Sequence, residues 1–165
     1  MGAVDALLPE FDHEMTTTRK VLERVPEHKF DWKPHAKSFS LRELAQHVAT
    51  IPMWGSVTLN QSELDVAGDQ RMPPVKTRAE LLSMFDQHVA STRNALAGTA
   101  DAALMAPWSL KRGTQTIFTM PKMAVWRSFV MSHLIHHRAQ LAVYLRLNDV
   151  PVPSMYGPSA DEGAF

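Results

Sequence analysis

The sequence contains no cysteine among its 165 residues. This absence excludes disulfide bonds, thiolate metal ligands and a catalytic protein thiol, and it suits a protein of a reducing compartment. Any thiol chemistry would therefore need a thiol supplied by a substrate or a cofactor.

An excess of charge of either sign is also missing, because 17 Lys and Arg residues balance 17 Asp and Glu residues. A nucleic-acid footprint or a funnel for acidic substrates usually needs such an excess. We therefore expect no nucleic-acid partner, and a small molecule or a protein instead. No apolar run approaches the roughly 18 residues of a membrane span, and the N-terminus lacks the pattern of a signal peptide. These features predict a cytoplasmic protein that does not associate with membranes.

Apolar residues recur at helical spacing in four segments of the chain. Ser40 and Glu43 begin one of them, and Thr77 and Glu80 another, with the spacing of a capping box. The four predicted helices cover residues 4–25, 40–61, 77–98 and 121–148.

The connections between these segments predict how the helices pack. Two of the three are long, which favours an all-α fold, a four-helix bundle with at least one crossover connection. Residues 106–118 form two short β-prone runs around a glycine, so we expect a hairpin-like excursion before the last helix. The bundle should occupy residues 1–149, with the proline-rich residues 150–165 as an extended tail of the same domain.

Three histidines fall within five residues of the last predicted helix. His133 and His137 are four residues apart and share one helix face, which is a chelating geometry, whereas His136 points about 100° away from His137. His47 lies on the apolar stripe of the second predicted helix. Three converging imidazoles would suit a divalent metal ion with an open coordination position.

A second interpretation of these histidines is structural, because a histidine on an apolar face is often a hydrogen-bonded core residue. The segment also lacks the glutamate that metalloprotease helices place beside their histidines, which disfavours a protease. We expect His136 to be solvated or at an interface, and Arg138 and Gln140 to orient the last helix against the chain terminus.

Three stretches of the chain, LAQHV at 44–48, HLIHHRAQL at 133–141 and NDVPVPSMYGPSAD at 148–161, resemble the DinB/YfiT-like metalloenzyme family. Ala139 is one departure, since many relatives carry glycine there. The resemblance implies a four-helix bundle in which His47, His133 and His137 bind the metal, with zinc or nickel as the expected ion. It also implies a tendency to form homodimers and, in several branches, transfer of a low-molecular-weight thiol such as bacillithiol or mycothiol to an electrophile.

The leading hypothesis is therefore a metal-dependent enzyme that acts on a small electrophilic molecule, a thiol S-transferase that uses an external thiol. The alternatives are a metal-assisted hydrolase and a non-catalytic metal-binding or stress-response module. Trp54, Trp126 and Tyr144 lie one or two turns from the candidate ligands, where they would either wall a substrate pocket or belong to the core.

Overall fold

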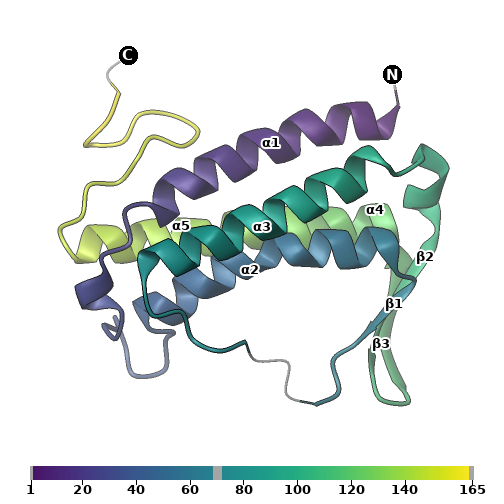
Figure 1. The fold of residues 1–165 in the computed structure, drawn as a ribbon, viewed down its shortest axis with the longest axis horizontal. Coiled ribbons are helices and arrows are strands. Elements are labelled where there is room, and N and C mark those ends of the chain that lie inside the picture. Colours follow the sequence, from purple (N-terminus) through teal and green to yellow (C-terminus); the bar gives the residue numbers. More distant parts are fainter. Residues whose placement is uncertain (1, 69–71, 164–165) are drawn as a thin grey trace.

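The computed structural model describes residues 2–68 and 72–163 of the chain. Four long helical stretches lie side by side and form a bundle (Figure 1). They are α1 (Ala3–Leu22), α2 (Leu41–Asn60), α3 (Arg78–Ala97) and a last stretch in which α4 (Lys122–Val125), a π-helical segment (Trp126–Ser132) and α5 (His133–Leu147) follow one another. Each predicted helix is confirmed to within one turn.

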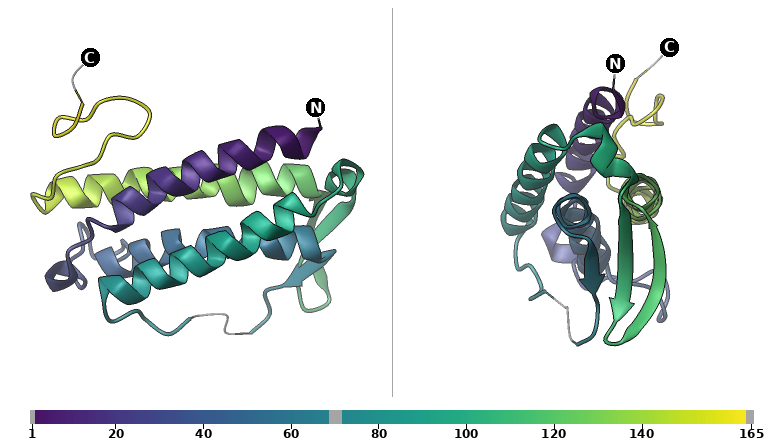
Figure 2. Two further views of the ribbon diagram at one scale, coloured as in Figure 1. Left: turned by 45° about the horizontal axis from the view of Figure 1, so that its top comes forward. Right: turned by 90° about the vertical axis from the view of Figure 1, so that its right-hand side faces the viewer.

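The path of the chain includes the expected crossover. Helices α2 and α3 run in the same direction, so the chain returns along the length of the bundle between them (Figure 1). The small sheet lies at one end of the bundle and the C-terminal segment at the other (Figure 2). The carboxyl end of α2 is therefore next to the sheet, and the carboxyl end of α5 is next to the tail.

The predicted bundle with a hairpin-like excursion is confirmed, but the all-α class is not exact, because the described residues include a three-stranded sheet. Strands β2 (Pro107–Arg112) and β3 (Gln115–Pro121) form the expected hairpin, and Gly113 has the positive φ angle of 58° that its turn requires. The third strand, β1 (Glu63–Asp65), pairs with β2 in parallel orientation. Three residues are too few to show the alternating pattern that identifies a strand in a sequence.

The start of α2 follows from local chemistry that the sequence shows. The Ser40 hydroxyl accepts the Glu43 backbone N–H at 3.2 Å, and the Glu43 carboxylate accepts the Ser40 N–H at 2.6 Å. At α3 the Thr77 hydroxyl accepts the Glu80 N–H, but the Glu80 carboxylate binds the N–H of Lys76 instead of Thr77. The first predicted capping box is confirmed, and only half of the second forms.

The apolar faces of all four helical stretches meet in one core. Among the largest side chains with less than 2% exposure is that of an arginine, Arg138 of α5. It pairs with the buried carboxylate of Glu14 on α1 at 2.7 Å, and it donates to the Thr18 hydroxyl at 3.1 Å and to the Tyr156 hydroxyl. Arg138 therefore contacts the C-terminal segment, as expected from the sequence, and joins it to α1.

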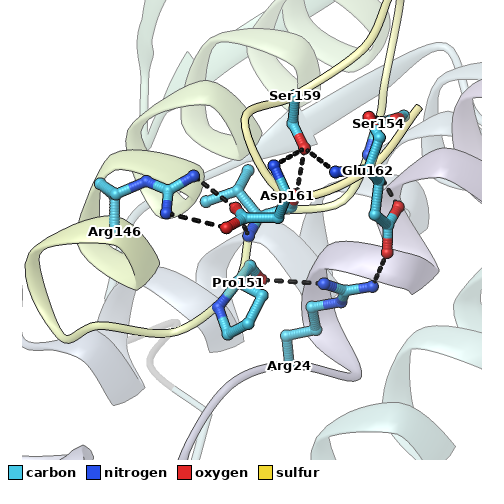
Figure 3. Close-up of polar contacts among 8 residues, drawn as sticks. Arg24, Arg146, Pro151, Ser154, Ser159, Asp161 and Glu162 are labelled. Atoms are coloured by element: carbon cyan, nitrogen blue, oxygen red, sulfur yellow. Dashed lines mark hydrogen bonds and ion pairs between the residues drawn. The ribbon is translucent and has the colours of Figure 1, made fainter. Parts of the chain in front are cut away.

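The C-terminal segment, residues 150–163, has no regular secondary structure. Ion pairs connect it to the bundle (Figure 3). Asp161 pairs with Arg146 near the end of α5, and Glu162 pairs with Arg24 just after α1. Arg24 also donates to the carbonyl of Pro151 at 3.0 Å. The segment thus bridges the first and last helices of the bundle.

Across residues 2–68 and 72–163, none of the helices combines the length and the apolar character needed to cross a lipid bilayer.

Candidate metal centre

Three half-buried histidine side chains from two helices converge where α2 packs against α5. His47 lies in the first half of α2, and His133 and His137 lie one turn apart at the start of α5. The Nε2 atoms of His47 and His133 are 3.1 Å apart, and the ring of His47 is 4.5 Å from that of His137, centre to centre. One nitrogen from each ring lies within 4.8 Å of the other two. The structure therefore brings together the three histidines that the sequence singles out.

Hydrogen bonds fix how two of these rings present their nitrogens. The Nδ1 of His133 lies 3.3 Å from the carbonyl oxygen of Phe129, and the Nδ1 of His137 lies 2.7 Å from the side-chain oxygen of Gln140. Each acceptor requires a proton on Nδ1, so the Nε2 of each ring is left with a free lone pair. This is the arrangement by which outer hydrogen bonds orient histidine ligands of metals.

The electrostatic surroundings keep the imidazoles neutral. Burial, with smaller contributions from His137 and His133, lowers the pKa of His47 from its usual 6.5 to about 4. Burial also lowers the pKa values of His133 and His137. All three rings are therefore uncharged near pH 7, which is the state in which imidazole binds a metal ion.

The donor set fits a divalent ion on geometric grounds. Nitrogen ligands at about 2.0–2.1 Å from a tetrahedral ion lie about 3.3 Å from one another. The 3.1 Å between the His47 and His133 nitrogens is close to that separation. In the metal-free protein the same distance suits a hydrogen bond in which Nε2–H of His47 donates to the Nε2 lone pair of His133. Within the described residues, no cysteine, carboxylate or fourth histidine joins the set.

The π-helical segment Trp126–Ser132, immediately before His133, is a feature that sequence reasoning missed. Its i→i+5 pattern replaces the usual i→i+4 ladder, and π-helical segments often occur at functional sites. It contains Phe129, whose carbonyl oxygen is the acceptor for the His133 ring. No residue pattern in these seven positions distinguishes them from an ordinary α-helix.

The role of Gln140 also differs from the prediction. Instead of orienting the helix against the chain terminus, its side-chain oxygen accepts the hydrogen bond of His137. The spacing of three residues on a helix offers this pairing, so the signal was present in the sequence.

His136 is exposed and stays outside the triad, as expected from its position on the helix. Its ring packs edge-on against that of His137, with centres 4.8 Å apart. His88, which has no predicted role, lies with Nδ1 3.0 Å from the carbonyl oxygen of Ala49 and is a hydrogen-bonded structural histidine.

Aromatic side chains flank the triad on two sides. The Trp54 ring lies edge-on to His133 at 5.9 Å, and the Phe39 ring lies 6.0 Å from His47. Tyr144 lines an open groove beside His137 and donates its hydroxyl to the Phe39 carbonyl at 3.2 Å. Trp126 is fully buried against Phe11 and belongs to the core. Trp54 and Tyr144 therefore border the site, whereas Trp126 does not.

The fold and the site together define a helical-bundle protein with a half-buried histidine triad. A family model described as the DinB family matches residues 1–164. This chain belongs to the DinB family.

Individual proteins also resemble this chain in sequence or in fold. The uncharacterized protein YrdA of Bacillus subtilis is 24% identical over 164 residues, which cover 98% of this chain and 92% of YrdA. A DinB-like protein of Bacillus cereus has a similar structure, with a TM-score of 0.71 at 17% identity over 92% of this chain and 97% of that one. The DinB-like protein YjoA of Bacillus subtilis gives 0.69 at 17% identity, over 91% and 96%. These two structures support the fold.

Proposed function

We propose that this protein is a metal-dependent enzyme in which His47, His133 and His137 bind one divalent ion, zinc or nickel. The observation that carries the proposal is the convergence of three neutral imidazoles whose nitrogens lie within 4.8 Å of one another. Three protein ligands are the number found in catalytic zinc sites, which keep one position for water or substrate.

The surrounding residues have positioning roles in this proposal. The Phe129 carbonyl and the Gln140 side chain hold the His133 and His137 rings with Nε2 directed away from their acceptors. When bound, the ion supplies a Lewis acid that lowers the pKa of a thiol or a water molecule. The groove beside His137 provides room for the substrate next to this position.

The reaction we propose is transfer of an external thiol to an electrophilic small molecule. The sulfur of the thiol forms a bond to the electrophilic carbon, and the thiol proton leaves to solvent with the displaced group, or is returned to the product where nothing is displaced. Family membership supports this chemistry, and the absence of cysteine means that the sulfur must come from outside the chain.

Metal analysis of the purified full-length protein tests the ligand assignment. We expect about one ion per chain in the wild type and in the His136→Ala variant, and little metal in the His47→Ala, His133→Ala and His137→Ala variants. His136→Ala is the matched control because it removes an exposed imidazole from the same helix. Full metal content in the three triad variants would refute the site.

A second assay tests the reaction. The metal-loaded protein is incubated with monochlorobimane in the presence of bacillithiol, mycothiol or glutathione, or with no thiol, and the conjugate is measured by fluorescence. We expect a rate above the uncatalysed one only when a thiol is present. In a parallel measurement with electrophilic esters, consumption of the ester at a rate that does not depend on thiol would favour the metal-assisted hydrolase instead.

A further inference from the structure

An open groove of about 450 Å³ lies beside the triad, between the loop before α2 and the exposed side of α5. His137 forms part of its wall, so a molecule in the groove would lie next to one of the proposed metal ligands. This volume is within the range of pockets that bind small molecules.

Three polar side chains of this groove can donate hydrogen bonds to a ligand. Lys37 contributes an ammonium group, and Ser38 contributes a hydroxyl. The side-chain oxygen of Gln140 is occupied by the N–H of His137, which leaves its NH₂ group, a donor only, for a ligand. Among the described residues that line the groove, none carries a carboxylate. The groove therefore offers positive charge and donors to an acceptor-rich, negatively charged group.

The remaining walls of the groove are apolar. Phe39 and Val143 are large hydrophobic side chains with exposures of 49% and 57%, and Pro34, Tyr144 and the buried Leu44 also line the groove. The hydrogen bond from the Tyr144 hydroxyl to the Phe39 carbonyl ties the loop to α5 and holds these two walls together. Covering this surface would remove apolar area from water.

We propose that the groove binds small-molecule carboxylates with an apolar body, with the carboxylate at Lys37 and the body against Phe39, Val143 and Tyr144. This names the substrate class of the proposed metal-dependent reaction and in that respect rests on it. At Lys37 the groove offers one ammonium group with neutral donors, and this part of the groove matches a monoanion such as a carboxylate better than a doubly charged phosphate.

Binding of defined probes to the full-length, metal-loaded protein tests this proposal. Hydrocinnamate has a carboxylate and an apolar ring, hydrocinnamamide lacks the charge, and propionate lacks the ring. We expect hydrocinnamate to bind about tenfold more tightly than either, measured by titration calorimetry or NMR, because hydrogen bonds to charged groups are the stronger ones. Tighter binding of phenyl phosphate than of hydrocinnamate would overturn the choice of carboxylate.

Two lysine variants show whether Lys37 is the anchor. In Lys37→Met the preference for hydrocinnamate over its amide should disappear, while Lys29→Met, which removes an equal charge from an exposed residue outside the groove, should keep it. The proposal would be refuted if both variants lost the preference for hydrocinnamate equally, or if Lys37→Met kept it. The second result would mean that the carboxylate binds elsewhere, for example at the metal.

Metal content separates this proposal from the proposed function. Lys37→Met should hold as much metal as the wild type, because Lys37 is not among the triad. If the triad holds metal but hydrocinnamate and its amide bind equally, the carboxylate proposal fails and the metal centre stands. If the triad variants keep their metal but Lys37 still determines the preference for the acid, the metal centre fails and the groove stands.

Discussion

Single hydrogen bonds decide how the triad presents its nitrogens. In His133 and His137 the Nδ1 atom faces an oxygen acceptor, and these acceptors, Phe129 and Gln140, come from the same helical stretch as the rings they orient. The two acceptors differ in one respect: the first is a backbone carbonyl, which substitution cannot remove, whereas the second is a side chain. Gln140 is therefore the position at which this orientation can be tested directly.

Replacing Gln140 with leucine should weaken metal binding by about 10–100-fold, the usual cost of losing an outer partner of a histidine ligand. Competition with a chromophoric chelator measures this affinity. Gln87→Leu is the matched control, because Gln87 is an exposed helix residue whose side-chain amide donates to the Ser83 hydroxyl and lies outside the triad. An unchanged affinity in Gln140→Leu would show that the hydrogen bond to His137 has no part in binding.

The low pKa of His47 predicts how stability depends on pH in the metal-free protein. An unfolded chain protonates this histidine near pH 6.5, whereas the folded protein resists protonation until about pH 4. The unfolded state therefore binds more protons between these values, and the free energy of unfolding should fall as pH is lowered from 6.5 towards 4. Allowing for the partial exposure of the ring, we expect a loss of about 1–2 kcal/mol from His47.

Urea unfolding of chelator-treated protein at several pH values measures this dependence. The His47→Gln variant should lose part of the slope between pH 6.5 and 4, whereas His136→Ala should keep most of it, because His136 has only a minor effect on the pKa values of His133 and His137. A slope in His47→Gln equal to that of the wild type would contradict the effect of burial on this histidine.

The helices themselves were predictable, because each carries an apolar face and two begin with recognisable caps. Ser40 and Glu43, for example, form the reciprocal hydrogen bonds that their spacing predicts. The π-helical segment and β1 were not predictable. The first depends on a backbone ladder that side-chain periodicity does not report, and the second has three residues and pairs with a strand far along the chain.

The candidate site could also be predicted in part from the sequence. Helical spacing identified His133 and His137 as a pair, and the apolar position of His47 made it a candidate third member. The spacing of residues did not predict the groove. Lys37 and Ser38 come from a loop, and the placement of this loop against α5 depends on contacts such as that of Tyr144 with Phe39.

At the level of helix pairs, α2 lies close to both α3 and the π-helical segment at Gly55. A Cβ atom built there would lie 2.5 Å from Cγ2 of Thr92 and 3.0 Å from Cζ3 of Trp126, both of which are buried side chains. Gly55→Ala should therefore destabilise the protein by about 1–3 kcal/mol, the usual cost of overpacking.

Urea or thermal unfolding measures this cost. Gly98→Ala at the end of α3 is the control, because a Cβ there meets atoms no closer than 3.5 Å, which is ordinary contact. A Gly55→Ala variant as stable as the wild type would contradict the close packing of these helices at Gly55.

Over the whole molecule, the buried pair of Arg138 and Glu14 joins α5, α1 and the C-terminal segment. The Tyr156 hydroxyl donates to the Glu14 carboxylate at 2.8 Å and accepts from Arg138. Arg138→Met would leave the carboxylate buried without its cation, which typically costs about 3–5 kcal/mol. We expect a loss of that size in urea unfolding, together with faster proteolysis within residues 150–163.

Arg127→Met is the matched control, since Arg127 pairs with Glu10 of α1 but is 53% exposed, and exposed pairs contribute less than about 1 kcal/mol. Adding Glu14→Leu to Arg138→Met should recover part of the loss, because the unpaired charge is then removed as well. Equal stabilities of Arg138→Met and Arg127→Met would contradict the role of the buried pair.

The separation of the triad along the chain has a consequence for unfolding. His47 and His133 are 86 residues apart, and α3 and the whole sheet lie between them. An ion held by both would act as a cross-link, and closing a loop of this length removes conformational entropy from the unfolded chain worth about 4–5 kcal/mol in the chain-entropy model. A chain without cysteine cannot form a disulfide, so coordination would give it a cross-link that withstands reductants and that a chelator can open.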